Sequence, residues 1–169
     1  MEQNKTALIV GMAKSGIGAA KLLARNGYHV RINDMKAEIP GLAEALCGAA
    51  VEYRLGEDPL TLLDGVDLVV PSPIIPMTAP FLVEAKRRGI EIESEIELGY
   101  RYAKADFVCI TGTNGKTTCT ALTGELFKAA GFRTFVLGNI GVAITEHAEE
   151  TRPGDVIVAE TAALQLQGG

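Results

Sequence analysis

Short apolar runs alternate with segments of helical periodicity along most of this 169-residue chain. The first run, residues 6–11, ends at a glycine, and residues 17–27 follow with apolar side chains spaced as on one face of a helix. Further strands are expected at residues 29–34, 51–56, 66–73 and 90–94, and helices at residues 41–48, 58–65 and 78–89. Asp58 is the expected N-cap of the second of these helices. This alternation is typical of βαβ units. It predicts an α/β fold with a parallel sheet and helices on both of its faces.

A second alternation begins at Ala105. It comprises apolar runs at residues 105–112, 133–138 and 155–160, with helical patterns at residues 116–131 and 142–150. Cys109 lies in the first of these runs and is expected in the core. So few strands and helices are unusual for an independent α/β domain. We therefore predict two domains, residues 1–93 and residues 94–169, and expect the second to be only the N-terminal part of a larger domain.

Residues 111–118, TGTNGKTT, lie between an apolar run and a predicted helix. Their spacing differs from the common phosphate loop G-x-x-x-x-G-K-[ST], because Ile110 stands where that pattern has its first glycine. Glycines still let backbone N–H groups approach a phosphate, and a helix N-terminus adds partial positive charge. We therefore predict a P-loop-type ATP site with Lys116 as its catalytic residue. It comprises Gly112, Thr113, Asn114, Gly115, Lys116, Thr117 and Thr118. The alternative is a glycine turn that precedes a helix and binds nothing.

An acidic residue supports the nucleotide site. Glu160 ends the predicted strand at residues 155–160. A carboxylate at the carboxyl end of a parallel strand, beside a phosphate loop, is suitably placed to hold Mg²⁺. We predict that Glu160 and the hydroxyl of Thr117 lie next to this ion, although an acid after a strand is by itself often only solvated.

The first glycine turn resembles a dinucleotide site but departs from it. Residues 11–18, GMAKSGIG, carry Ala13 where G-x-G-x-x-G has its middle glycine, which normally lets the backbone approach a pyrophosphate. Asp34 ends the second predicted strand, the usual place of an acid that binds ribose. This pattern favours a diphosphate-linked nucleotide facing Lys14 and Ser15, without dehydrogenase chemistry. A tight turn with no ligand remains the alternative.

Composition excludes several other classes of function. The net charge is −5, no basic stripe occurs, and aromatic residues make up 5%, so we expect no nucleic-acid partner. Three cysteines without a C-x-x-C pair favour a reducing compartment, and two histidines far apart in the sequence argue against a zinc site. The apolar N-terminal run is too short and too interrupted by glycine for a signal peptide or membrane span. We expect a cytoplasmic protein with no membrane partner.

Taken together, the motifs resemble those of the Mur ligases of peptidoglycan synthesis. The resemblance rests on TGTNGKTT at 111–118, GNIG at 138–141, Glu160 with LQL after it, and Ser-Pro at 72–73. It covers essentially the whole chain and is closest to the branch that adds D-glutamate to UDP-N-acetylmuramoyl-L-alanine. It implies a Rossmann-like first domain and a central ATPase domain. In this chemistry ATP phosphorylates the substrate carboxylate, and the amine of D-glutamate attacks the acyl phosphate.

The resemblance also implies a set of residues that contact the UDP-linked substrate. They are Lys14, Ser15, Asp34, Met35, Lys36, Ser72, Pro73 and Asn139. Among them, Asp34 is expected to read the uracil or ribose, and Ser72 with Pro73 to border the diphosphate.

The chain also departs from the family pattern. Ile74 replaces a glycine after Ser-Pro, and Ala162 with Ala163 replaces two serines. A downstream histidine, a carbamylated lysine and a C-terminal domain are missing, so we expect an inactive, monomeric N-terminal fragment that still binds the UDP substrate. The alternative from another class is a stand-alone nucleotide-binding regulatory module without ligase chemistry.

Overall fold

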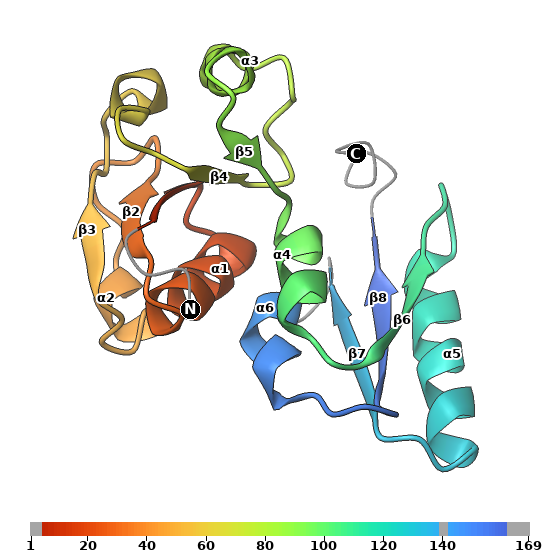
Figure 1. The fold of residues 1–169 in the computed structure, drawn as a ribbon. Coiled ribbons are helices and arrows are strands. Elements are labelled where there is room, and N and C mark those ends of the chain that lie inside the picture. The colour runs from red at the N-terminus through yellow and green to blue at the C-terminus, as the bar shows by residue number, and fades with distance from the viewer. Residues whose placement is uncertain (1–4, 139–141, 162–169) are drawn as a thin grey trace. The chain divides into compact units, whose positions relative to one another are not determined.

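The protein folds into two units, which divide between Glu95 and Ile96 (Figure 1). The structure is a computed structural model that describes residues 5–138 and 142–161. Every strand pair in both sheets is parallel, and helices accompany the strands, which confirms the predicted α/β class. No helix in these described ranges is long and apolar enough to cross a membrane.

The first unit contains a five-stranded parallel sheet in the order β3-β2-β1-β4-β5. Its elements are β1 (Thr6–Val10), α1 (Lys14–Arg25), β2 (His29–Asn33), α2 (Leu42–Ala45), β3 (Val51–Tyr53), the 3-10 helix η1 (Pro59–Leu62), β4 (Leu68–Pro71), α3 (Pro80–Arg87) and β5 (Glu91–Ile92). Because β2 and β4 flank β1, the strand order reverses at β1. In open α/β sheets, the carboxyl edge at such a reversal is where ligands bind.

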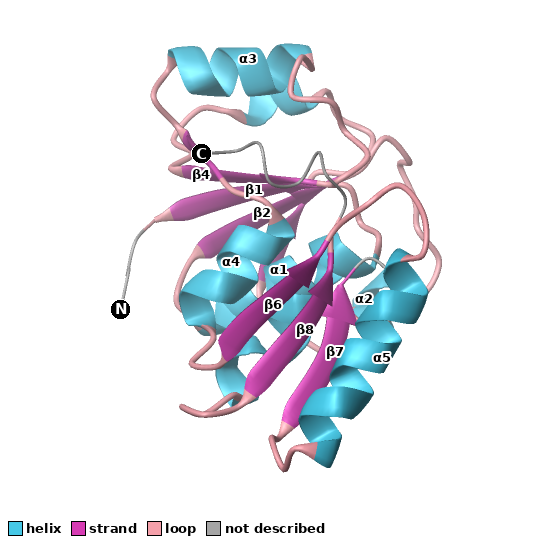
Figure 2. Ribbon diagram, turned by 90° about the vertical axis from the view of Figure 1, so that its right-hand side faces the viewer, coloured by secondary structure: helices cyan, strands magenta, loops and turns pink. Residues whose placement is uncertain are grey.

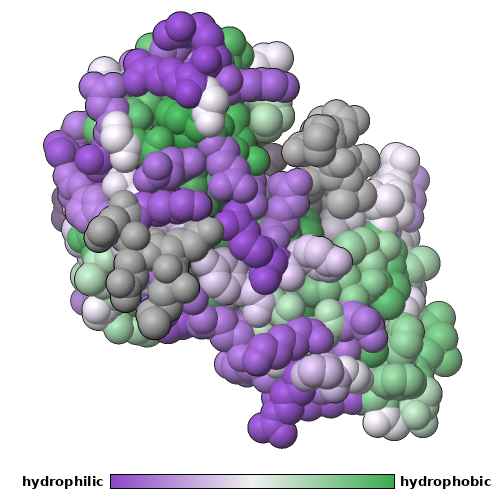
Figure 3. All heavy atoms as spheres, viewed as in Figure 1, coloured by the Kyte–Doolittle hydropathy of each residue, from purple (hydrophilic) through white to green (hydrophobic). Residues whose placement is uncertain are grey.

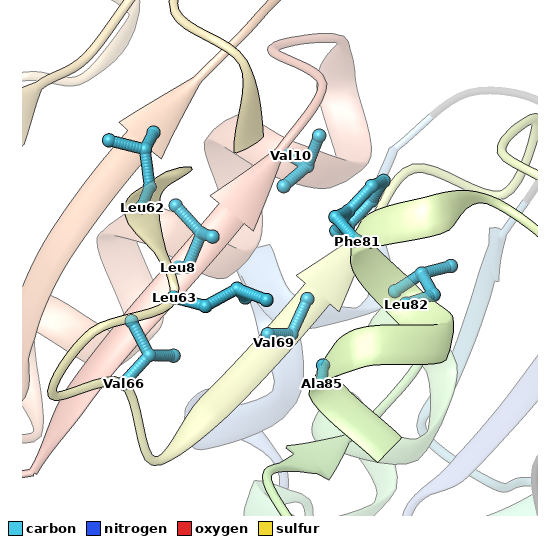
Figure 4. Packing of buried hydrophobic residues seen from close by; sticks show 9 residues of the cluster. All are labelled: Leu8, Val10, Leu62, Leu63, Val66, Val69, Phe81, Leu82 and Ala85. Carbon is cyan, nitrogen blue, oxygen red and sulfur yellow. The ribbon is translucent and has the colours of Figure 1, made fainter. Parts of the chain in front are cut away.

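Apolar side chains on the inner strands form the core of this unit. Leu8 and Val10 on β1 and Val69 on β4 share one face of the sheet, and Phe81, Leu82 and Ala85 of α3 pack against them (Figure 4). The central strands are almost fully buried, which explains why their sequences are continuous apolar runs rather than alternating ones.

Three predicted segments of the first unit are shorter than expected. The helix predicted at residues 41–48 keeps one turn, and the strand predicted at residues 90–94 keeps two residues. The helix predicted at residues 58–65 is a 3-10 turn, although Asp58 caps it as expected by accepting the N–H of Leu60 at 3.0 Å. Segments this short form few internal hydrogen bonds, which do not offset the entropic cost of a longer helix or strand.

The second unit contains a three-stranded parallel sheet in the order β6-β8-β7. Its elements are α4 (Glu95–Tyr102), β6 (Asp106–Ile110), α5 (Lys116–Ala129), β7 (Thr134–Gly138), α6 (Ile144–His147), the 3-10 helix η2 (Ala148–Glu150) and β8 (Val156–Glu160). Helix α5 lies along one face of this sheet, where Gly124 contacts Val136 (Figure 2). The next residue, Leu137, points to the opposite face and packs with Ile144 of α6.

Cys109 is exposed, so the prediction that it lies in the core is wrong. It belongs to β6, which is at the edge of the described sheet and is only partly buried along its length. Helix α5 is similarly open, because Leu122 and Leu126 are 60% and 63% exposed. Figure 3 shows apolar residues gathered over this side of the second unit.

Candidate functional site

The ends of the three strands in the second unit lie in register. Ile110 of β6 and Gly138 of β7 both pair with Glu160 of β8. Because the strands are parallel, their carboxyl ends meet at one edge, and the loop at residues 111–115 leaves β6 at that same edge. The register therefore places the predicted phosphate loop beside the predicted metal carboxylate.

The backbone of the loop suits an anion. Gly112 and Gly115 have positive φ angles of 156° and 75°, and Gly115 occupies the left-handed region directly before α5. The first amides of a helix have no partner within the helix and point along its axis toward the N-terminus. Within the described residues, the N–H groups of residues 113–118 make no hydrogen bond to the protein. They are therefore available to a bound phosphate.

The two residues predicted to hold Mg²⁺ are in contact. The Thr117 hydroxyl donates a hydrogen bond to Glu160 Oε2 at 3.1 Å, although 43 residues separate them in sequence. Glu160 is 4% exposed. The described residues contain no cluster of three or more His, Cys, Asp or Glu side chains that could hold a metal. A hydroxyl and one carboxylate, completed by phosphate and water oxygens, make a donor set that fits Mg²⁺ rather than a softer metal.

Lys116 lies over the loop that it follows. Its ammonium Nζ donates a hydrogen bond to the carbonyl of Gly112 at 2.7 Å. This contact holds the positive charge at the loop, where the terminal phosphates of a nucleotide would lie. A phosphate that draws this ammonium toward itself exchanges the carbonyl contact for a charge-assisted bond.

Glu160 is positioned by Gly138, which the sequence analysis noted only as the start of GNIG, and by Thr161, which it did not single out. A Cβ on Gly138, whose φ is 115°, would lie 2.5 Å from the carbonyl oxygen of Glu160, so only glycine lets β7 approach β8 this closely. The backbone N–H of Thr161 donates to the carbonyl of Ile110 at 2.9 Å and continues the ladder beyond Glu160. The strand-ending glycine was visible in the sequence, but its contact depends on a register that only the structure supplies.

The glycine turn of the first unit is closely packed. A Cβ on Gly16 would lie 2.0 Å from the carbonyl oxygen of Gly11, and one on Gly11 would lie 2.6 Å from the Cβ of Ser72. The N–H of Met12 donates to Asp34 Oδ2 at 2.8 Å. Both glycines therefore have a packing reason to be there, whether or not a ligand binds.

The predicted UDP contacts of the first unit come from three neighbouring strands. Lys14 and Ser15 begin the helix after β1, Asp34 to Lys36 follow β2, and Ser72 with Pro73 follow β4. All three segments lie at the carboxyl edge of the sheet around the reversal of strand order. Met35 is 96% exposed there, and Ser72 is buried. Asn139 lies outside the described residues.

The N-terminal part of the chain matches a known protein family. Residues 5–94 match the family model of the Mur ligase MurD-like N-terminal domain. The chain belongs to the MurD-like Mur ligases. It is 47% identical over 170 residues to the UDP-N-acetylmuramoylalanine–D-glutamate ligase of Alkaliphilus metalliredigens (strain QYMF), covering 98% of this chain and 37% of that protein. It is 41% identical over 167 residues to the enzyme of the same name from Staphylococcus aureus (strain JH9), with the same coverage of 98% and 37%. This MurD-like chain therefore spans a little over a third of the length of these relatives.

Solved Mur ligases share its fold. The UDP-N-acetylmuramate:L-alanyl-gamma-D-glutamyl-meso-diaminopimelate ligase from Neisseria meningitides matches with a TM-score of 0.57 and 20% identity, over 94% of this chain and 54% of that one. UDP-N-acetylmuramate-alanine ligase MurC from Thermotoga maritima matches with a TM-score of 0.55 and 20% identity, over 94% and 37%. At this identity the likeness concerns the fold of the MurD-like chain and not its substrate.

Proposed function

We propose that this chain provides the UDP-substrate site and part of the ATP site of a ligase that joins D-glutamate to UDP-N-acetylmuramoyl-L-alanine. The names of its MurD-like relatives support the reaction, and the strand-edge geometry of both units supports the two nucleotide sites. A cytoplasmic location and a monomeric state are part of the same proposal.

In this proposal, the second unit binds ATP through the loop amides at residues 113–118. Lys116 neutralises charge that develops on the transferred phosphoryl group. Thr117 and Glu160 would hold Mg²⁺, and the ion would supply positive charge that withdraws electron density from the phosphate. The buried Glu160 carboxylate keeps its orientation because Gly138 and Thr161 fix the backbone on either side of the strand end.

The first unit would bind the UDP moiety at the carboxyl edge around β1. Ser15 and the N–H groups that begin α1 face the expected diphosphate, with Lys14 and Lys36 adding positive charge nearby. Ser72 and Pro73 border the turn on the β4 side, and Met35 offers an apolar surface on the β2 side. Asn139 is included by resemblance to the family.

The hydrogen bond between Thr117 and Glu160 is the observation on which the ATP site depends most, because it joins the loop to the acid. Titration calorimetry of ATP, with Mg²⁺ and then with EDTA, tests it. We expect Mg²⁺ to strengthen binding to the unsubstituted chain, and T117V and E160Q to abolish that gain while leaving the metal-free affinity nearly unchanged. K116A should weaken binding in both conditions.

Two matched variants control this experiment. T123V makes the same substitution further along α5, and D106N neutralises an exposed acid at the amino end of β6. Both should bind as the unsubstituted chain does. A chain that binds ATP equally well with and without Mg²⁺, or not at all, contradicts the proposed site.

A second titration tests the first unit. UDP-N-acetylmuramoyl-L-alanine should bind the 169-residue chain, and no amide bond should form when ATP and D-glutamate are added, since the chain spans only 37% of its relatives. Absence of binding would refute the UDP site. Phosphate release that depends on D-glutamate would refute the expected inactivity of these residues alone.

A further inference from the structure

Asn33 ends β2 with a buried polar side chain, which is 1% exposed. Its Nδ2 donates hydrogen bonds to the backbone carbonyl of Arg54 at 2.6 Å and to that of Glu57 at 2.9 Å. Both partners belong to the loop at residues 54–58, which leaves β3 at the carboxyl edge of the sheet. One side chain therefore fastens the start of this loop to the end of β2.

The chemistry of the two partners favours asparagine at this position. A carbonyl oxygen only accepts hydrogen bonds, and the NH2 group of a carboxamide has one hydrogen for each of the two carbonyls. A leucine has the same branch point at Cγ but no donor, so it would leave both carbonyls without this bond. The side chain of Asn33 therefore contributes hydrogen bonds to the loop and not only packing.

The loop that Asn33 holds supports the segment after β2. The N–H of Gly56 donates to the backbone carbonyl of Asp34 at 2.8 Å. A Cβ on Gly56 would lie 3.0 Å from the Cβ of Ala37, so the loop and the segment are in close contact. Asn33 therefore acts on residues 34–37 through the loop.

Residues 34–37 need this support because they have little packing of their own. They lie outside the strands and helices, residues 35–37 are exposed, and Met35 is exposed to 96%. Within the segment, the N–H of Lys36 donates to Asp34 Oδ1 at 3.1 Å, and that oxygen keeps a second acceptor site for a ligand. Asp34 is expected to read the uracil or ribose, and Met35 lies next to it, so this segment carries the nucleoside side of the proposed UDP site.

We propose that Asn33 is a positioning residue for the nucleoside part of that site. It holds the loop at residues 54–57, and the loop holds the segment that carries Asp34 and Met35. Because Asn33 is almost fully buried, it acts without touching the ligand. This inference rests on the proposed UDP site and deepens it, since it separates binding of the nucleoside from binding of the diphosphate.

Affinities of the 169-residue chain for UDP and for pyrophosphate, which lacks the nucleoside, test this role. We expect N33L to weaken UDP binding about ten-fold and to change pyrophosphate binding by no more than about two-fold. The backbone carbonyl of residue 33 accepts the N–H of Gly11 at 2.8 Å, and a side-chain substitution keeps that tie to the turn that would face the diphosphate. An equal loss for both ligands, or no loss for UDP, overturns the inference.

Asn26 supplies the matched control. Its Nδ2 donates to the carbonyl of Leu22 at 2.9 Å, at the end of α1 and away from the carboxyl edge of the sheet. N26L removes that bond by the same change of side chain and should alter neither affinity by more than about two-fold. A selective loss of UDP binding in N26L as well would overturn the inference.

A second pair of variants tests the loop without changing Asn33, and applies also where N33L does not fold. G56A places a methyl group against Ala37 at a residue with φ 75°, whereas G48A carries the same strain at φ 76° with nothing within 4 Å. We expect G56A to weaken UDP binding about five-fold with pyrophosphate unchanged, and G48A to change neither. If G56A and G48A bind UDP equally well, the loop does not act on the segment and the inference is wrong.

Amide hydrogen exchange without ligand tests the tie separately. The N–H of Gly56 should exchange about ten-fold faster in N33L than in the unsubstituted chain or in N26L, and equal rates would overturn the inference. If the unsubstituted chain binds neither UDP nor pyrophosphate, the proposed UDP function fails, and the positioning role toward a ligand fails with it. If the unsubstituted chain binds UDP and folded N33L binds it equally well, only the present inference fails.

Discussion

In both units the first strand is followed by a glycine turn and a helix, but the two sheets place that strand differently. In the first unit β1 is central, between β2 and β4, and the turn after it is packed against Ser72 and held by Asp34. In the second unit β6 is at an edge, and a Cβ on Gly115 would meet nothing within 4 Å. A glycine turn after a strand can therefore be required by packing in one sheet and left free for a ligand in another.

The comparison is tested most strongly by adding a methyl group to each turn. G16A places a Cβ against the carbonyl of Gly11 and should destabilise the first unit by more than about 3 kcal/mol. G115A adds only the strain of a left-handed residue and should cost the second unit about 1 kcal/mol. Hydrogen exchange read by mass spectrometry for peptides of each unit measures both. Equal losses would remove the distinction between the two turns.

Truncating a leucine in the helix after each turn should likewise destabilise the first unit more than the second. L23A removes a fully buried side chain of α1 and should cost about 2 to 3 kcal/mol in the 169-residue chain. L126A removes a largely exposed side chain of α5 and should cost less than about 1 kcal/mol. Denaturant unfolding followed by exchange in each unit provides the measurement. A large loss in L126A would mean that α5 is covered in solution.

A further pair of substitutions tests whether the close approach of β7 to β8 constrains Glu160 at the strand edge of the second unit. G138A should cost about 2 kcal/mol, because the new Cβ strikes the backbone of Glu160 in addition to straining the left-handed residue. G131A carries the same strain at φ 91° with nothing nearby and should cost about 1 kcal/mol. Thermal unfolding compares the two. If G138A proves as mild as G131A, β7 does not constrain Glu160 through this contact.

The smallest expected effect is on the pH dependence of the stability of the first unit, and it involves a carboxylate near the surface. Hydrogen bonds from His29, then from Arg54 and Arg31, lower the pKa of Glu52 from its ordinary 4.5 to about 2. Glu52 therefore stabilises the folded unit above pH 4.5, and this contribution disappears as the pH falls from 4.5 through 2. E52Q should lose less than about 1 kcal/mol at pH 7, as is usual for exposed ion pairs, and should show a weaker acid dependence.

The matched change in the second unit is E125Q, which breaks an exposed pair with Lys128 on α5. It should leave the acid dependence of unfolding almost as it was. A pH profile of thermal unfolding from pH 2 to 7 separates the two variants, and identical profiles for E52Q and the unsubstituted chain would contradict the expected role of Glu52.

The sequence predicted the parts that depend on local pattern. Buried strands such as β1 and β4 are continuous apolar runs, and α1 and α5 follow glycine turns, so their positions and the α/β class could be read directly. Cys109 was misplaced because an edge strand and a central one have similar apolar sequences, and only the strand order β6-β8-β7 distinguishes them. The pairing of Asp34 with backbone amides and the contact of Gly138 with Glu160 are tertiary, and no local spacing encodes them.

The central place of β8 also has a consequence for the order in which the second sheet can assemble. Neither β6 nor β7 pairs with the other, so both wait for the last strand of the three to arrive between them. On a ribosome, the loop at residues 111–118 emerges 42 residues before Glu160, the acid that is proposed to hold Mg²⁺ with Thr117. During that interval the three-stranded sheet is incomplete, so if the loop binds nucleotide as proposed, its affinity should appear only as synthesis passes β8.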